Sequence, residues 1–367
     1  MTERYIPYQP EIVTPPGETL VDLLEEQAMT QTELAMRMGR PTKTINEIVH
    51  GKTAITPETA LQLEKIFATP ADYWLNHEAN YRAYLARLEE EKRLSACHDW
   101  LAHHPVRFLK QMGILPNLHN RGKNKTILLQ KLLGFYAVAS PEEWETYYGE
   151  VRAAYRRSQA MPGDPYATVA WLRLGELEAA KISCPPFDRK RFATALQACR
   201  ALTLLPPEEF EPRLKSLCAE AGVMLILLPG LPGARVSGVA RWLYQRPFIQ
   251  LSLYGKTNDK FWFNFFHEAA HILLHSHKLI FLDEEMENGF SQEEEEANAF
   301  AASLLIPPVW EAELPELRSR EVVRAFAGRI GIHPGIVVGR LQHDQVIEQS
   351  WLNDLKERFT WSETLDE

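Results

Sequence analysis

The chain has 367 residues, of which 45% are hydrophobic and 24% charged, and its formal net charge at pH 7 is -9. These values are typical of a globular protein of two or three domains, and no apolar run reaches the ~18 residues that a membrane span requires. The negative charge argues against a protein that coats nucleic acid by bulk attraction, so any DNA contact must be local.

The N-terminal residues and the cysteines do not indicate a secreted protein. The first 18 residues are polar and proline-rich, without the basic start and apolar core of a secretory signal. The four cysteines have no CxxC spacing, which indicates neither a disulfide framework nor a cysteine zinc site. We therefore expect a cytoplasmic protein.

A helix, turn, helix pattern lies between residues 30 and 68. Apolar residues recur at helical spacing on both sides of Gly39, and TQTE at 30–33 offers an N-cap with a glutamate three residues later. Ala35 lets the two helices approach, Gly39 permits the turn, and Ile45 packs the second helix across the first. This pattern predicts a helix-turn-helix, whose second helix enters the major groove of DNA.

The polar residues of this region are the ones that we expect to contact DNA. Outward side chains of the second helix would read the groove, while other polar and basic side chains would lie near the backbone and its phosphates. The expected DNA-binding residues are Gln31, Arg40, Thr42, Lys43, Thr44, Asn46 and Lys52. A plain packed helix pair is the alternative, since short helices around a glycine occur in many folds.

Residues 15–94 resemble the HigA-type antitoxins of the Xre repressor group, through PPGE, HGKTAITPETAL and ADYWLNHEANY. The resemblance implies a five-helix DNA-binding domain that forms a homodimer on a palindromic operator, often its own promoter and often next to a ribonuclease toxin. Residues 1–94 hold 10 Lys and Arg against 15 Asp and Glu, so we expect a DNA affinity that is modest or depends on dimerisation.

The middle of the chain, from residue 95 to 216, is rich in Leu, Ala, Arg and Trp, with breaks at MPGDP, CPPFD and LLPPEE. It predicts a helical domain without a catalytic motif. The basic stretch NRGKNK could touch DNA or an acidic partner, but a solvent-exposed loop is the favoured interpretation.

Three short β-rich runs follow, at residues 222–229, 234–244 and 246–253. They are bounded by turn-forming residues and predict three strands of a mainly antiparallel sheet. A helical pattern begins soon after them with FWFNFFHEAAHILL, at residues 261–274.

The sequence HEAAH places His267 and His271 four residues apart on one helical face, where two imidazoles can bind one zinc ion. Glu268 could take a proton from a metal-bound water without binding the metal itself. A core helix with neutral, hydrogen-bonded histidines is the alternative. It would leave several buried polar groups to be partnered, at about 1–3 kcal/mol for each one that is not.

A catalytic zinc needs a third protein ligand. His277 has the spacing of the longer HExxHxxGxxH signature, but Leu274 replaces the glycine whose turn would bring it to the metal. Glu294 is the other choice, on a helix predicted from residue 291 to the prolines at 307–308, and Asn298 on the same face would orient a zinc-bound histidine. Ser291 and Glu294 also spell a capping box, in which Glu294 binds no metal.

Residues 215–343 resemble the ImmA/IrrE family of metallo-endopeptidases, through FHEAAHILLH, EANAFAASLLIP and GIHPGIVVGRLQHD. The resemblance implies that His267, His271 and Glu294 bind zinc and that Glu268 is the catalytic glutamate. It also implies a substrate with a helix-turn-helix domain. The donor set alone would suit Mn²⁺ or Fe²⁺ as well.

Residues 322–344 repeat the small-residue, glycine and apolar register of the first domain, with Ala327, Gly331 and Val337. They predict either a second helix-turn-helix or a helical pair that supports the peptidase domain, and we assign them no DNA contacts. For the oxyanion of peptide hydrolysis, the sequence offers Arg241, Tyr244 and Tyr254 without ranking them.

The sequence thus predicts a mainly α protein with a small β-sheet, of the α+β class. We expect a helix-turn-helix domain at residues 1–94, a helical domain at 95–216 and a zincin-like domain at 217–367, whose C-terminal end is the helical pair. The expected function is a DNA-binding regulator fused to a zinc endopeptidase that cleaves a repressor or antitoxin. The alternative is an antitoxin-like repressor with a catalytically silent peptidase fold that binds a toxin.

Overall fold

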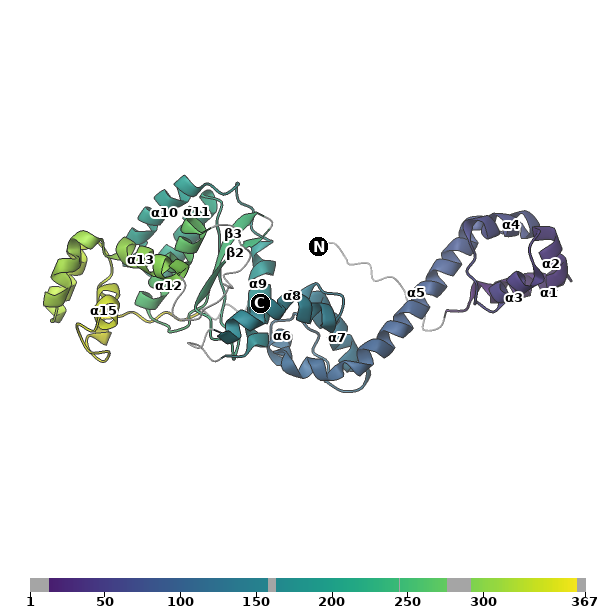
Figure 1. Cartoon of the computed structure of the whole chain (residues 1–367), viewed down its shortest axis with the longest axis horizontal. Helices are drawn as coiled ribbons and strands as arrows, with labels where there is room; N and C mark the ends of the chain where they lie inside the picture. Colours follow the sequence, from purple (N-terminus) through teal and green to yellow (C-terminus); the bar gives the residue numbers. More distant parts are fainter. Residues whose placement is uncertain (1–12, 158–162, 244, 276–291, 362–367) are drawn as a thin grey trace. The chain divides into compact units, whose positions relative to one another are not determined.

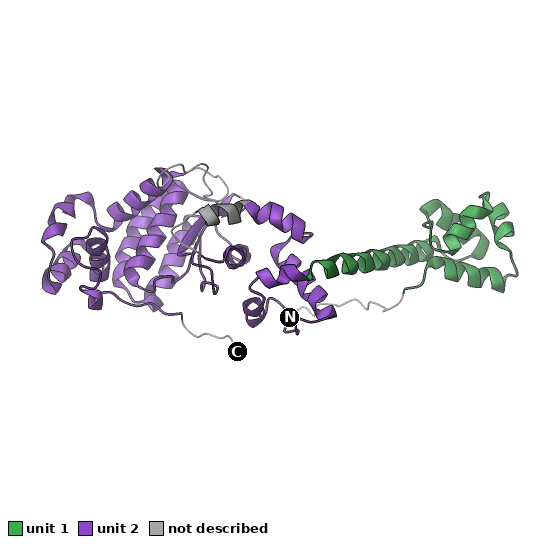
Figure 2. Cartoon of the chain, turned by 60° about the horizontal axis from the view of Figure 1, so that its bottom comes forward, with its two compact units in different colours: residues 1–98 green, residues 99–367 purple. Residues whose placement is uncertain are grey.

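The computed structural model describes residues 13–157, 163–243, 245–275 and 292–361 (Figure 1). The chain divides into two compact units, residues 1–98 and residues 99–367 (Figure 2). Within the described ranges the protein is mainly helical with one small three-stranded sheet, as the sequence predicts. The boundaries expected at residues 94 and 216 stay predictions. None of the helices in these ranges is both long and apolar enough to cross a bilayer.

The first unit is built from helices. They are α1 (Pro16–Glu26), α2 (Gln31–Met38), α3 (Thr42–Val49), α4 (Pro57–Phe67) and α5 (Ala71–Ala96). Its core holds the apolar residues that the helical spacing singles out, including Leu34, Ile45 and Ile48, all at most 2% exposed. Burial of such residues, at roughly 25 cal/mol per Å² of apolar surface, is what holds α2 against α3.

The expected signals for this pair of helices are present. The Thr30 hydroxyl caps α2 by accepting a hydrogen bond of 3.1 Å from the Glu33 backbone N–H. Gly39 ends α2 with a φ of 62°, a left-handed conformation that glycine adopts without the strain a Cβ would add. The prediction of helix, tight turn and helix is therefore confirmed.

The second unit begins with helical segments that lead to the sheet. They are η1 (His98–His103), α6 (Val106–Gln111), α7 (Lys123–Tyr136), α8 (Pro141–Arg157), α9 (Pro165–Ala179), α10 (Arg189–Ala201), η2 (Leu202–Leu204) and α11 (Pro207–Glu220). Phe192 and Leu196 of α10, with Phe210 and Leu214 of α11, belong to the same buried cluster as α12.

The sheet has the order β1-β3-β2, with strands β1 (Met224–Leu227), β2 (Gly238–Leu243) and β3 (Arg246–Leu251). The three predicted strands are thus confirmed, and the sheet is mixed, where a mainly antiparallel one was expected. β2 and β3 form an antiparallel hairpin, whereas β1 pairs with β3 in parallel. The parallel pair forms because β3, the second strand of the hairpin, lies in the centre of the sheet beside β1.

Helices cover both faces of this sheet. Residues Met224, Ile226 and Phe248 pack with Ala179 of α9 on one face. The alternate residues, including Ala240 and Ile249, pack on the other face with α11 and with α12 (Asn258–Leu274). The face toward α12 is the one that carries the candidate site.

The remaining elements pack around α12. They are α13 (Gln292–Leu305), η3 (Pro308–Glu316), α14 (Arg320–Ile330), α15 (Pro334–His343) and η4 (Asn353–Leu355). Helix α13 ends before Pro307, as expected, and Ala297 and Ala301 are completely buried where it lies against α12. Small side chains at these positions let the two helix backbones approach closely.

Gly17 offers a test of the packing of the first unit. A Cβ at this position of α1 would lie 2.5 Å from the Ile48 carbonyl oxygen and closer still to that of Val49, both on the backbone of α3. Gly17→Ala should therefore destabilise this unit by about 1–3 kcal/mol, because overpacking moves a backbone. Hydrogen exchange of the α1 and α3 amides measures the effect.

Gly134→Ala in α7 is the matched control, since a Cβ there has open space around it. It should leave exchange in α1 and α3 unchanged and add up to ~1 kcal/mol of helix stability. Equal protection of α1 and α3 in the wild type and in Gly17→Ala would contradict the close approach of the two helices.

Candidate functional site

Helix α12 is held in place by its aromatic residues. Phe261, Trp262, Phe265 and Phe266 are at most 5% exposed and fill the core between the sheet and the surrounding helices. The aromatic run is therefore structural. Because these residues fix the rotation of the helix, the opposite positions, which include His267 and His271, face α13.

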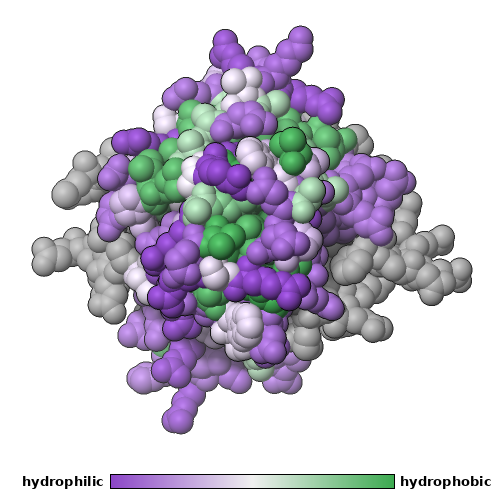
Figure 3. All heavy atoms as spheres, turned by 90° about the vertical axis from the view of Figure 1, so that its left-hand side faces the viewer, coloured by the Kyte–Doolittle hydropathy of each residue, from purple (hydrophilic) through white to green (hydrophobic). Residues whose placement is uncertain are grey.

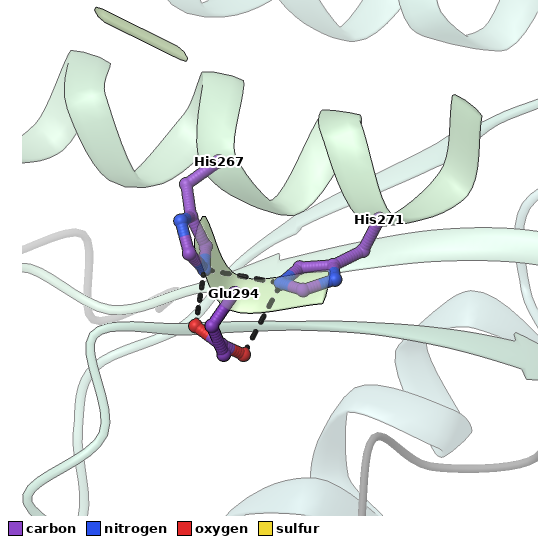
Figure 4. Close-up of side chains that lie close together, drawn as sticks. All are labelled: His267, His271 and Glu294. Carbon is purple, nitrogen blue, oxygen red and sulfur yellow. Dashed lines mark hydrogen bonds and ion pairs between the residues drawn. The ribbon is translucent and has the colours of Figure 1, made fainter. Parts of the chain in front are cut away.

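The two histidines of HEAAH meet Glu294 of α13. The Nε2 atoms of His267 and His271 lie 3.1 Å apart, and each lies near a different oxygen of Glu294, at 3.3 and 3.4 Å respectively (Figure 4). The ligand atoms of the three side chains lie within 4.8 Å of one another. The structure thus brings together the three residues that the sequence singled out as metal ligands.

This donor set fits a metal ion. Two imidazole nitrogens and a carboxylate are the ligands of many catalytic zinc sites, which keep a further position open. The hydrogen bonds from His267 and His271 hold the pKa of Glu294 well below its usual range. Burial acts to lower the pKa of His267, but Glu294 and Glu268 outweigh it and the net shift is upward. The carboxylates therefore favour a positive charge where the two histidines and Glu294 meet.

Glu268 lies beside this cluster without being part of it. Its carboxylate accepts a hydrogen bond from the Ala240 backbone of β2, and burial raises its pKa, which the two histidines partly oppose. A Cβ on Gly238 would come within 3.0 Å of the Glu268 carboxylate, so the strand can approach the glutamate this closely because position 238 is glycine. A carboxylate with a raised pKa is suited to accept a proton.

Asn298 occupies the position expected of a residue that orients a histidine. Its Oδ1 lies 3.0 Å from Nδ1 of His267, one turn along α13 from Glu294. Ser291 and His277 lie outside the described residues. Sequence reasoning assigned no role at this site to His275, which lies next to His271, or to Glu296, which lies next to His275. The recurrence of histidine at 267, 271 and 275 was the signal that pointed to the first of these.

The residues that the sequence offered for binding the oxyanion differ in where they lie. Arg241 is on the opposite face of the sheet from α12, where it pairs with Glu176 of α9 at 2.6 Å and is buried. Tyr244 lies outside the described residues. Tyr254 is 44% exposed and lines a cavity of about 760 Å³ with Phe263 and Asn264 of α12. The structure therefore removes Arg241 and leaves Tyr254, whose cavity is also lined by Asn298.

The expected DNA-binding residues lie on and around α2 and α3 of the first unit. Thr42, Lys43, Asn46 and Lys52 are exposed, while Gln31, Arg40 and Thr44 are half-buried. Asn46 Nδ2 lies 3.5 Å from Gln31 Oε1, so the start of α2 and the middle of α3 share one surface. Arg40 instead donates to Gln62 at 2.7 Å, which ties its side chain to α4.

Helices α14 and α15 resemble α2 and α3 locally, because Gly331 ends α14 with a φ of 71°. The second helix of this pair is not free, however. No residue of α15 from 334 to 342 is exposed, and Ile336, Val337 and Leu341 are buried in the core around α12. Figure 3 faces this end of the molecule, where hydrophilic residues surround small hydrophobic patches. Of the two predictions, this burial favours the supporting helical pair.

Comparisons with known proteins agree with the two regions. A peptidase-family model described as the IrrE N-terminal-like domain matches residues 218–341, and a helix-turn-helix model matches residues 20–74. Virulence-associated protein A of Dichelobacter nodosus is 41% identical over 68 residues, which are 18% of this chain and 67% of that protein. A solved structure of an addiction module antidote protein of a HigA family from Coxiella burnetii is 32% identical, covers 23% of this chain and 92% of its own, and superposes with a TM-score of 0.21.

The helix-turn-helix match spans α2 and α3, and the IrrE-like match spans the sheet, α12, α13 and most of α15. The chain therefore belongs to the family of virulence-associated protein A, and it is a fusion of a helix-turn-helix domain with an IrrE-like peptidase-family domain.

Proposed function

We propose that this protein is a cytoplasmic transcriptional regulator that binds operator DNA and carries a zinc-dependent endopeptidase, which cleaves a helix-turn-helix repressor or antitoxin. The observation that carries the enzymatic part is the convergence of His267, His271 and Glu294, with Glu268 half-buried beside them. A helix that only fills the core does not require two histidines and a glutamate to meet at one point.

Each residue of the site has a role in this proposal. His267, His271 and Glu294 would hold the ion, and Asn298 would keep the His267 ring in place. Bound zinc supplies Lewis acidity, which polarises a scissile carbonyl and lowers the pKa of a coordinated water toward ~7. Glu268 accepts the proton from the attacking water and returns it to the leaving amine. The raised pKa of Glu268 suits both transfers.

The sheet offers a place for the substrate. β2 is an edge strand, and it runs from Gly238 to Leu243 past the Glu268 carboxylate. An extended peptide could add to this edge by main-chain hydrogen bonds. The cavity near Tyr254 and Phe263 would then accept substrate side chains.

The first unit would bind DNA through α3. Lys43 has an 86% exposed side chain, which pairs with Glu47 at 3.8 Å and could meet a phosphate instead, and the exposed Asn46 could reach a base edge. The low proportion of basic residues favours a homodimer, because two copies double the number of phosphate contacts on a palindrome.

Replacing Glu268 with Gln tests the peptidase. Glu268→Gln keeps the size of the side chain but removes the group that accepts the proton, so cleavage of a co-expressed repressor should fall by at least ~10²-fold while zinc remains bound. Repressor cleavage followed on immunoblots, with metal content measured in parallel, provides the readout. Unchanged cleavage would refute the role of Glu268. Absence of cleavage by the wild type on every tested repressor and antitoxin, with toxin binding retained, would support a catalytically silent antitoxin.

The metal content of two variants tests the ligand set. We expect about one zinc per chain in the wild type and loss of stoichiometric zinc in both His271→Ala and Glu294→Ala. Glu295→Ala is the matched control, because Glu295 is the exposed neighbour of Glu294. Elemental analysis after dialysis measures the zinc. Retention of zinc in Glu294→Ala alone would assign that carboxylate to a helix cap instead.

The DNA-binding face is tested with Lys43→Ala. On the DNA upstream of its own gene, this variant should bind more weakly and lower the dependence of log K on log salt by about one unit per subunit, since one phosphate contact is lost. Lys65→Ala, at an exposed position of α4, serves as the control and should bind like the wild type. A salt dependence of Lys43→Ala equal to that of the wild type would place the DNA contact elsewhere.

A further inference from the structure

His275 lies one turn after His271, directly beyond the end of α12. Its Nδ1 is 3.0 Å from Nδ1 of His271, and its Nε2 is 3.3 Å from a carboxylate oxygen of Glu296 on α13. The other oxygen of Glu296 accepts a hydrogen bond of 2.7 Å from Gln292. A continuous line of polar contacts therefore runs from His271 through His275 to Glu296.

Metal binding by His271 permits only one arrangement of protons along the contacts from His271 to His275 and Glu296. His271 points its Nε2 at Glu294 and His267, so as a ligand it must keep that nitrogen free of a proton and carry its proton on Nδ1. The acceptor 3.0 Å away is Nδ1 of His275. His275 must then carry its own proton on Nε2, which is the atom that faces the Glu296 carboxylate. This arrangement satisfies the ligand nitrogen of His271, its contact with His275, and the contact of His275 with Glu296.

His267 has the same kind of support on its other side. Its Nε2 faces Glu294, and its Nδ1 lies 3.0 Å from the side-chain oxygen of Asn298. Both histidines of the cluster thus present Nε2 to the same point and have an acceptor at Nδ1. This correspondence is what distinguishes His275 from a histidine that is merely nearby.

We propose that His275 and Glu296 are positioning residues for His271, which fix the tautomer and orientation of its ring and so strengthen metal binding. The inference rests on the metal site of the proposed function. Partners of this kind at the far nitrogen of a ligand histidine typically change metal affinity by about 10- to 100-fold.

A role of His275 in ending the helix does not account for these contacts. The helix end uses the backbone N–H of His275, which donates to the His271 carbonyl at 3.2 Å. The side chain is not needed for that bond.

The two residues should differ in importance. His275 contacts the ligand directly, whereas Glu296 acts through His275 and its side chain is 45% exposed. Water can replace part of what an exposed carboxylate contributes. The effect of replacing Glu296 should therefore have the same direction as that of replacing His275 and a smaller size.

The test measures metal affinity, using the full chain. Zinc affinity by competition with a chromophoric chelator, and the absorption spectrum of the Co²⁺ form, are compared for His275→Phe, His275→Gln, Glu296→Gln and the control Glu295→Gln. Phenylalanine keeps an aromatic ring at this position but cannot accept the hydrogen bond from His271. We expect a zinc affinity about 10- to 100-fold lower in His275→Phe, partial recovery in His275→Gln through its amide oxygen, a loss of a few-fold in Glu296→Gln, and no change in the control.

The possible results separate the two proposals. Zinc affinity and a Co²⁺ spectrum equal to those of the wild type in both His275→Phe and Glu296→Gln would overturn the positioning role while leaving the metal site in place. A wild type that binds no zinc would overturn the metal site itself, and the positioning role with it. Because Glu296 is exposed, its variant tests the inference even where His275→Phe fails to fold.

Discussion

The candidate metal centre depends on the packing of α12 against α13. The contacts between these helices join His267 to Asn298, and His271 to Glu294 one turn earlier on α13. The buried residues Ala297 and Ala301 allow the close approach. A larger side chain at either position would move Glu294 away from the histidines by more than a ligand bond can tolerate.

Three carboxylates near α12 have different surroundings, and these surroundings give them different proposed roles. Glu294 lies between two histidines, which hold its pKa low and keep it charged as a ligand must be. Glu268 is held by the β2 backbone, and partial removal from solvent raises its pKa, which suits proton transfer. Glu296 is at the surface and reaches His275. Three similar side chains are thus given different proposed roles by their surroundings. Glu294 is the ligand, Glu268 the base and Glu296 the positioning partner.

Much of this could be predicted from local patterns, because the relevant physics is local. Gly39 and the apolar residues around it indicate the helix-turn-helix, and the spacing of His267 and His271 indicates a common helical face. Glu294 was harder, since its spacing from Ser291 also fits a helix cap, and a resemblance to a known family was needed to favour the metal. The parallel pairing of β1 with β3 was missed because the order of strands is set by contacts distant in sequence.

Arg241 and His275 illustrate what a pattern within one element can and cannot predict. Alternation along β2 could have excluded Arg241, since Ala240 faces α12 and its neighbour must face away. By contrast, the partner of His275 is on another helix, and no pattern within α12 identifies Glu296. Contacts between elements fixed the positions of both residues. The sequence shows the alternation along β2 and the spacing of His275 from His271, but not the contact of His275 with Glu296.

The most direct measurement of the central claim is X-ray anomalous scattering at the zinc edge from crystals of the zinc-loaded protein. The account predicts one strong peak, about 2.0–2.2 Å from Nε2 of His267, Nε2 of His271 and the carboxylate of Glu294, with Glu268 nearby but outside bonding distance. A peak bound to Glu268 or at another set of side chains, or no peak between α12 and α13, would contradict it.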